Sequence, residues 1–237
     1  MKPLKLDLHT HTLASGHAYG TIMEMAQAAA EKGIEILGIT EHAKGIPETC
    51  EDAYFYNLRV VPRELMGIRL LLGAEINIID YEGNLSMEEE LMRRMDICIA
   101  GIHAQCYQFG NVEENTEAVI GAIKNPLVDE ISHPDDGFCP LDYERIVKAA
   151  KEYHTLLEIN NNSLQLPFRK NVFENQVKLL RLCKQQEQPI LISSDAHFPT
   201  DIGSIQEVER VFAEVDFPEE LILNYYPEKI LSFLSKN

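Results

Sequence analysis

The chain has 237 residues, a formal net charge of −17 and an ordinary globular composition, with 45% hydrophobic and 25% charged residues. This length suits one domain, spanning residues 1–237, with a sizeable core. The negative charge is spread along the chain and would repel a phosphate backbone, so we expect no nucleic-acid partner.

The five cysteines are odd in number, widely separated and never spaced as CxxC. We therefore expect no disulfide framework and a reducing, cytoplasmic location. The first residues include lysines, but no apolar stretch typical of a signal peptide follows them. No apolar run approaches the ~18 residues that a membrane span requires, so we expect no membrane partner.

Short apolar segments alternate with longer segments of helical period along the whole chain. This alternation is typical of βα units around a parallel sheet. Seven apolar segments are rich enough in Ile, Leu and Val to be strands buried on both faces. In chain order they are Leu4–Leu8, Ile34–Thr40, Ile68–Ile79, Ile97–Ile102, Val128–Ser132, Thr155–Ile159 and Pro189–Ser193.

Helix start signals lie between these segments. Thr21, Ser86 and Ser204 are each followed three residues later by Glu, the spacing of a capping box. Gly33 has the position of a residue that ends the first helix. The apolar residues at i, i+3, i+4 and i+7 from Ile146 predict a helix with one buried stripe.

The predicted architecture is a nearly closed barrel of seven βα units. An open nucleotide-binding sheet would require a glycine-rich turn after the first strand, where the sequence has His9-Thr10-His11-Thr12. No linker or internal repeat divides the chain, which supports a single domain.

Metal-binding side chains lie at the ends of several predicted strands, within the third strand at Glu75 and on the first loop at His17. Active sites of parallel barrels form at this end of the strands, so these side chains should converge. Imidazole with carboxylate is the ligand mixture typical of zinc, iron or manganese. The candidates are His9, His11, His17, His42, Glu75, His103, His133, Asp195 and His197.

A lone histidine is more often an ordinary core or surface residue, and we interpret His154 in this way. Seven histidines and two carboxylates at one barrel mouth would be costly without metal, so metal binding is the better explanation of the set. Glu41 is either a partner that orients a ligand ring or an exposed loop residue, and the sequence does not decide between them.

Eight ordered blocks of the sequence carry a family resemblance. They are DLHTHT from Asp7, SGHAY from Ser15, GITEH from Gly38, GAEIN from Gly73, AGIH from Ala100, ISHP from Ile131, LEINN from Leu157 and SDAH from Ser194. In these blocks the chain resembles the PHP (polymerase and histidinol phosphatase) family, especially its YcdX-like stand-alone phosphatases.

The resemblance implies a distorted, TIM-like (β/α)7 barrel with three divalent metal ions. Zinc is the first choice, with manganese and iron as alternatives. His9, His11, Glu75 and Asp195 would hold one ion, and Glu75 would bridge to a second ion held by His103 and His133. The third ion would take His17, His42 and His197. The sequence departs from the family pattern at Asp135-Asp136, where smaller or neutral residues are expected.

The function predicted in this way is a metal-dependent phosphatase that hydrolyses a small phosphorylated metabolite with a metal-bound hydroxide. No side-chain nucleophile is required. Four basic residues are candidates for contact with the phosphate: Arg59, Arg63, Arg169 and Lys170.

Three alternatives stay open at this point. The chain could be a histidinol-phosphate phosphatase or a related amidohydrolase-like hydrolase. A nuclease or proofreading module is disfavoured by the charge and by the lack of a basic or aromatic strip. A metal store or structural staple is disfavoured because three or four protein ligands per ion leave coordination positions open, as in catalytic sites. The sequence does not predict the oligomeric state.

Overall fold

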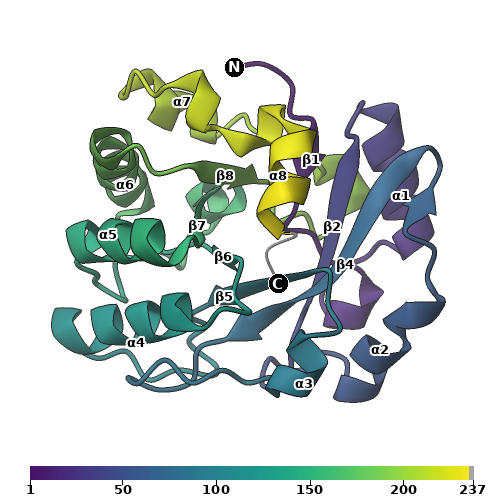
Figure 1. Ribbon diagram of the computed structural model, residues 1–237, viewed down its shortest axis with the longest axis horizontal. Helices are drawn as coiled ribbons and strands as arrows, with labels where there is room; N and C mark the ends of the chain where they lie inside the picture. The colour runs from purple at the N-terminus through teal and green to yellow at the C-terminus, as the bar shows by residue number, and fades with distance from the viewer. Residues whose placement is uncertain (235–237) are drawn as a thin grey trace.

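The computed structural model describes residues 1–234, and its parallel strands form a sheet that curls into a nearly closed barrel surrounded by helices (Figure 1). The strands are paired in the order β1-β2-β4-β5-β6-β7-β8. Their bounds are β1 Leu6–Asp7, β2 Ile36–His42, β4 Ile68–Asn77, β5 Ile97–Gly101, β6 Glu130–Ile131, β7 Leu156–Asn160 and β8 Ile190–Ser193. All seven predicted strands are present, and the (β/α)7 barrel is confirmed.

The eighth strand, β3 (Glu64–Leu65), pairs antiparallel with the start of β4 and was not predicted. It is too short to show an alternating pattern. The α-helices are α1 Ile22–Glu31, α2 Asp52–Asn57, α3 Glu89–Met92, α4 Val112–Lys124, α5 Tyr143–Tyr153, α6 Val172–Gln186, α7 Val208–Ala213 and α8 Pro227–Leu234. The 3-10 helices are Leu13–Ser15, Leu58–Val60, Asn162–Gln165, Pro199–Asp201, Glu219–Leu221 and Leu223–Tyr225. None of the helices within residues 1–234 combines the length and apolarity needed to cross a membrane.

One of the three predicted helix caps is confirmed. Thr21 and Glu24 form a reciprocal capping box at the start of α1, and Gly33 follows that helix with a φ of 75°. The other two predictions were wrong, because α3 and α7 begin later, with glutamates at their N-caps. Ser86 instead accepts hydrogen bonds from the backbone and side-chain amides of Asn77, at 3.1 and 3.0 Å. Its hydroxyl therefore holds a strand end rather than a helix.

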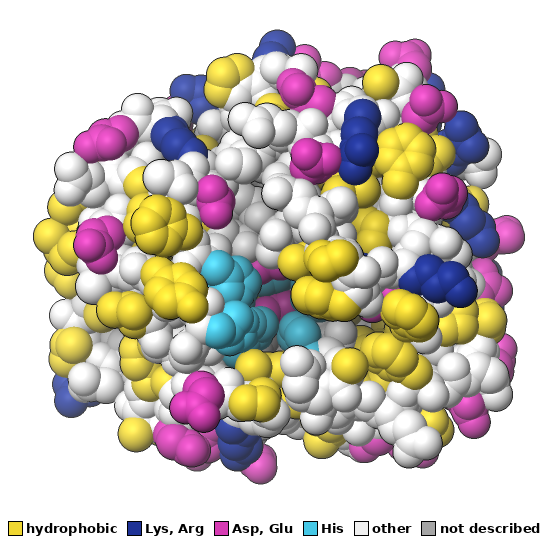
Figure 2. All heavy atoms as spheres, turned by 180° about the vertical axis from the view of Figure 1, so that it is seen from behind, with side chains coloured by type: hydrophobic (Ala, Val, Ile, Leu, Met, Phe, Trp, Pro, Cys, Tyr) yellow, Lys and Arg dark blue, Asp and Glu magenta, His cyan; other side chains and the backbone are white. Residues whose placement is uncertain are grey.

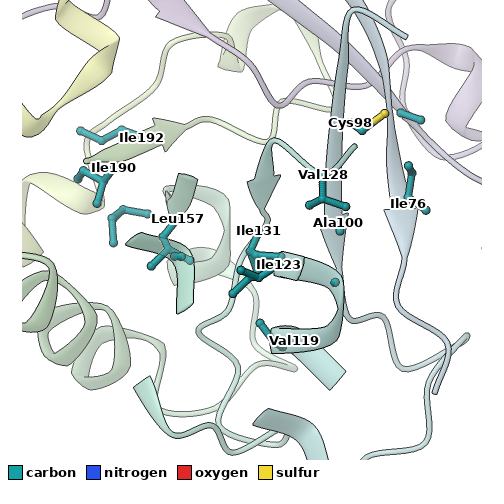
Figure 3. Packing of buried hydrophobic residues seen from close by; sticks show 14 of the residues in the cluster. Ile76, Cys98, Ala100, Val119, Ile123, Val128, Ile131, Leu157, Ile190 and Ile192 are labelled. Carbon is teal, nitrogen blue, oxygen red and sulfur yellow. The ribbon is translucent and has the colours of Figure 1, made fainter. Parts of the chain in front are cut away.

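The larger part of the core lies between the sheet and the surrounding helices. Figure 3 shows Val119 and Ile123 of α4 beside Ile131 of β6, with Ala100 of β5 in the same cluster. These strand residues point outward, because side chains alternate between the two faces of a strand. Burial of this layer provides the main driving force for folding.

A second, smaller cluster fills the barrel interior at the N-terminal ends of the strands, which we call the floor. Its fully or nearly buried members are Leu6, Leu8, Ile36, Leu71, Ile97, Ile99, Leu156, Leu191, Leu223 and Ile230. The last two belong to the C-terminal segment, whose helix α8 lies across this end of the barrel (Figure 1). The floor is thus closed to solvent.

Asn224 closes the barrel between β1 and β8, which do not pair along their length. Its side-chain amide donates to the carbonyls of Leu6, at 3.0 Å, and Ile192, at 2.7 Å. Its Oδ1 accepts from the backbone amide of Ile192 at 2.7 Å. At the opposite end a single bridge joins Thr10 to Ala196. The barrel is therefore closed by side-chain bonds at one end and by one backbone bridge at the other.

Candidate metal centre

The side chains that the strands direct into the barrel change from apolar to polar toward the C-terminal ends of the strands, which we call the mouth. On β4 the inward series begins with Leu71 in the floor and reaches Glu75 two positions beyond Gly73. On β7 it passes from Leu156 to Glu158 within two residues. One strand face therefore serves packing at one end and polar chemistry at the other.

The structure brings all nine predicted ligands together at the mouth, on the side of the molecule opposite α8. Figure 2 shows histidines and acidic side chains at the bottom of a hollow. The centroid of the His11 ring lies 4.3 Å from that of the His42 ring and 4.4 Å from that of the His197 ring. His17 is the outermost, with its ring 4.8 Å from that of His197.

Glu75 occupies the centre of the group and is completely buried. Its Oε2 lies 2.8 Å from His42 Nδ1 and 3.3 Å from His9 Nε2. Its Oε1 lies 2.7 Å from His133 Nε2 and 3.2 Å from His103 Nε2. The two oxygens of one carboxylate thus face two different groups of imidazoles, an arrangement suited to a bridge between two cations.

Three groups of ligand atoms within residues 1–234 are close enough together to hold a metal ion. They are His9, His11 and Asp195; His42, Glu75 and His103; and His11, His42 and His197. Two of the ligands expected from the resemblance, His17 and His133, lie beside these groups but belong to none of them. His42 belongs to two of the groups, so it lies between two ion positions, whereas the resemblance assigns it to one ion.

Several ligand rings are oriented by hydrogen bonds on the nitrogen that faces away from the cavity. His9 Nδ1 donates to Glu158 Oε1 at 2.7 Å, and His103 Nδ1 donates to Asn77 Oδ1 at 2.8 Å. Asn77 is the residue that Ser86 holds. Such partners fix the tautomer of a ligand histidine. They leave Nε2 of each ring with a lone pair directed inward.

Glu41 orients a third ring through Ser15, which resolves the choice that the sequence left open. Its carboxylate is fully buried and accepts from Ser15 Oγ at 2.6 Å. The same hydroxyl accepts from His11 Nδ1 and from the backbone amide of His42, each at 3.0 Å. Tyr54 also donates to Glu41, at 3.2 Å. Glu41 is therefore part of the frame of the site, not an exposed loop residue.

Glu158 is a site residue to which the sequence reasoning gave no role, although it lies within a block that carries the resemblance. It is fully buried on an inward position of β7, and it also accepts from the backbone amide of His133. A charged residue between Leu157 and Ile159 in a strand buried on both faces is the signal that could have identified it.

The electrostatics of the group require positive charge between the rings. His9 Nε2 and His11 Nε2 are 3.1 Å apart, and both rings donate from Nδ1, so two lone pairs would face each other. Burial lowers the pKa of His9, but Glu75, Glu158 and Asp195 together raise that pKa well above its usual value. Burial and the neighbouring histidines hold the pKa of His11 well below its usual value. One proton or one cation therefore fits between the two nitrogens.

Other buried atoms at the mouth face one another without the geometry of a hydrogen bond. Within residues 1–234 they include His42 Nδ1, His103 Nε2 and Glu75 Oε2, although His42 Nδ1 lies 2.8 Å from Glu75 Oε2 and His103 Nε2 lies 3.2 Å from Glu75 Oε1. A buried polar atom without a well-formed hydrogen bond costs about 1–3 kcal/mol. Three such atoms on the inner surface of one site, all of them good metal-ligand types, fit a set of divalent cations.

A cavity of about 570 Å³ opens outward from these ligands. Arg169 is the only Lys or Arg that lines it in the part of the chain that the structure describes. Lys170 is exposed, with its Nζ 5.7 Å from the centre of the Phe138 ring. Arg63 pairs with Asp96 at 2.7 Å, and the exposed Arg59 lies in the 3-10 helix after α2. The structure thus brings only Arg169 of the four predicted phosphate contacts into the cavity.

The departure from the family pattern at Asp135 has a structural explanation. Asp135 is buried and accepts from Gln176 Nε2 at 2.7 Å. Its Oδ1 lies 3.4 Å from Arg169 Nη1, and Arg169 also donates to Ser163 Oγ. Asp135 therefore holds the guanidinium group from behind and does not line the cavity itself.

Two further residues lie outside the metal centre. His154 is exposed, as expected for a histidine outside the metal site. It ends α5 in a left-handed conformation with a φ of 59°. Asp7 accepts from the backbone amides of Ser194 and Gly203, at 3.2 and 2.8 Å, and so joins β1 to the segment after β8.

Comparisons with known proteins point to one family. The PHP domain family pattern matches residues 7–166. A probable phosphatase of Acetivibrio thermocellus is 44% identical over 231 residues, covering 98% of this chain and 95% of that protein. A probable phosphatase of Clostridium novyi is 41% identical over 229 residues, covering 97% and 93%. Histidinol phosphate phosphatase of Lactococcus lactis, solved with zinc, L-histidinol and phosphate, has a similar fold, with a TM-score of 0.62, 18% identity and coverage of 90% and 94%.

Proposed function

The chain belongs to the PHP domain family and is a metal-dependent hydrolase of phosphate esters, and we propose that it dephosphorylates a small metabolite at a site for three divalent ions. The observation that carries the proposal is the buried Glu75 carboxylate, whose oxygens face two groups of imidazoles. One carboxylate shared by two cations is a typical feature of multinuclear phosphoesterase sites.

The proposed ligand sets keep the division that the family resemblance implies, and one of them, His9, His11 and Asp195, is also a group of close ligand atoms in the structure. His9, His11 and Asp195 would hold the first ion together with one oxygen of Glu75. The second oxygen of Glu75 would bind an ion with His103 and His133. The outermost ion would take His17, His42 and His197, whose rings cluster at the edge of the hollow. Zinc is the metal that we expect first, because imidazole is the predominant ligand.

The chain contributes position and charge to the reaction. Bound ions would lower the pKa of a coordinated water to about 7 and neutralise charge on the phosphoryl oxygens. Glu158, Glu41 and Asn77 keep the ligand rings in place from outside the cavity. No serine or cysteine side chain of the described residues lines the large cavity, so neither of these residue types supplies a nucleophile there.

Arg169 is the residue that we propose as the contact to the phosphoryl group. It lies in the cavity wall with its guanidinium fixed by Asp135 and Ser163. Arginine pairs well with phosphate oxygens because its planar fork matches their spacing. Replacing Arg169 by Ala should lower kcat/KM for every phosphate ester by about 10²-fold, the loss expected for a charge-assisted contact.

The function is tested by measuring phosphate release from a panel of monoesters, including p-nitrophenyl phosphate and histidinol phosphate. Chelation should abolish the activity, and added zinc or manganese should restore it. Exclusive turnover of histidinol phosphate would favour the histidinol-phosphate phosphatase alternative. Metal binding without hydrolysis of any ester in the panel would contradict the proposal and support a metal store.

A further inference from the structure

The cavity beyond the metal ligands has a mainly apolar wall. Apart from the predicted ligands and Arg169, six of its lining side chains are hydrophobic and large: Ile46, Ile102, Phe109, Phe138, Leu166 and Phe168. The same lining includes one further charged side chain, the acidic Asp136. In Figure 2 hydrophobic side chains lie on the rim of the hollow that holds the histidines. The alcohol portion of a phosphate ester bound at the metal centre would therefore lie against this wall.

Two phenylalanines of the wall are strongly exposed. Phe138 has 54% and Phe168 has 67% of its surface accessible. They lie on the loops after the neighbouring strands β6 and β7. Single exposed apolar residues are ordinary, but two exposed aromatic rings that line the same cavity next to a reactive centre are typical of a ligand site.

The two loops are joined to each other by hydrogen bonds, so the fold determines where the backbone presents the two rings. Gly137 donates its backbone amide to the Lys170 carbonyl at 2.7 Å. A Cβ atom at Gly137 would lie 2.7 Å from that same oxygen, which explains the glycine. Asp136 Oδ1 accepts from the backbone amides of Phe138 at 3.0 Å and Lys170 at 3.1 Å. The backbone that carries the two rings is therefore preorganised, which favours binding.

We propose that the alcohol portion of the substrate carries an aromatic ring, which packs against Phe138 and Phe168 while the phosphoryl group is at the metal centre. This inference rests on the proposed phosphatase function. Exposed phenylalanine rings gain from contact with another ring both by burial and by the preferred geometry of aromatic pairs.

From the charges of the cavity lining we also expect that the alcohol portion of the substrate carries no second anionic group. Arg169, the one Lys or Arg in the described lining, is needed for the phosphoryl group and is already held by Asp135. Asp136 in the wall and the net charge of −17 would both repel a carboxylate or a second phosphate.

The test compares three alkyl monoesters whose alcohols are similarly poor leaving groups: 2-phenylethyl, 2-cyclohexylethyl and ethyl phosphate. Wild-type protein loaded with metal should show a kcat/KM for the phenylethyl ester at least about 10-fold above that for the ethyl ester. The cyclohexyl ester should lie between them. The double variant Phe138→Ala/Phe168→Ala should lose most of the phenylethyl-to-ethyl preference, mainly through a higher KM for the phenylethyl ester.

Phe198→Ala is the matched control. Phe198 is a phenylalanine of similar exposure, 49%, on the loop after β8, and it does not line the cavity. This variant should keep the preference. Equal kcat/KM values for the three esters in wild-type protein, or a preference that survives the double substitution, would overturn the inference and leave the phosphatase intact. Absence of hydrolysis of all three esters would overturn the proposed function and this inference with it.

Discussion

The floor and the mouth of the barrel are built from the same strands, but they differ in what fills the interior. At the floor the inward residues of β4, β5 and β8 are Leu71, Ile97 and Leu191, which pack together under α8. At the mouth the same strands supply or lead into Glu75, His103 and Asp195. The floor is packed with hydrophobic side chains, whereas the mouth has buried polar atoms without hydrogen bonds, which a cation would satisfy.

This difference separates stability from function along one strand. A change at the floor should alter the free energy of unfolding and leave the chemistry of folded molecules intact. A change at the mouth should alter metal binding and catalysis more than folding. Four substitutions test the separation, and they follow in order of the effect that we expect.

Glu75→Gln should have the largest effect. The amide keeps the shape of the side chain but removes the charge that two ions would share. We expect kcat for p-nitrophenyl phosphate to fall by about 10³-fold or more, with fewer ions per chain by elemental analysis. Glu90→Gln, on the exposed surface of α3, is the control and should be unchanged. Full activity in Glu75→Gln would refute the bridging role.

Asn224→Ala tests the floor. The substitution removes three hydrogen bonds and leaves buried backbone groups of Leu6 and Ile192 without their partner. We expect the free energy of unfolding, measured by urea denaturation, to fall by about 2–4 kcal/mol. The kcat of the folded, metal-loaded protein should stay within a factor of about two. The exposed Asn84 provides the control, and an equal loss in Asn84→Ala would show that Asn224 has no special role.

Glu158→Gln tests the frame around the mouth. Its carboxylate accepts from His9 Nδ1 and from the backbone amide of His133 and lies outside the cavity, so it acts on metal through these two ligands. Loss of such a partner weakens metal affinity by about 10- to 100-fold. Competition with a chelator measures this affinity. An unchanged affinity, with lower stability alone, would reduce Glu158 to a structural residue.

Glu130→Gln tests the place where the floor meets the mouth. Glu130 is fully buried on β6, and neither of its oxygens has a hydrogen bond in the described structure. Burial first, and then the neighbouring Glu158, raise its pKa well above the usual value. Folding raises the pKa of such a carboxyl above its value in the unfolded chain. Below the unfolded pKa the group does not affect the free energy of unfolding. As the pH rises from the unfolded pKa toward the folded pKa, the group lowers that free energy progressively.

The variant cannot ionise, so its unfolding free energy relative to wild type should increase between pH 5 and pH 8. The gain should be about 1.4 kcal/mol for each pH unit between pH 5 and the folded pKa of Glu130. Parallel urea denaturation curves at the two pH values measure it. A difference between variant and wild type that is independent of pH would show that Glu130 is ionised in the folded protein as it is in the unfolded chain.

The sequence predicts the parts of this molecule that depend on local pattern. Strand segments such as Ile97–Ile102 are continuous apolar runs, and His103 follows such a run directly. The barrel and the convergence of the nine ligands both follow from this repeated arrangement, because parallel strands end at one side of a barrel. The family resemblance then supplied the division of the ligands among ions.

Features that depend on contacts between distant segments were not predictable in the same way. Asn224 meets β1 more than 200 residues away in sequence, and no local pattern marks it. Ser86 has the spacing of a helix cap, but its hydroxyl is engaged by Asn77 instead. Glu158 differs, because a buried charge in an apolar strand was visible and should have been interpreted as a partner of a ligand.

The most direct test of the whole account is a metal titration of the chelated, metal-free protein, followed by hydrolysis of p-nitrophenyl phosphate. The account predicts that activity is absent without metal and reaches its maximum at two to three equivalents of zinc or manganese per chain. Activity that persists in metal-free protein, or protein that binds no metal at all, would contradict it.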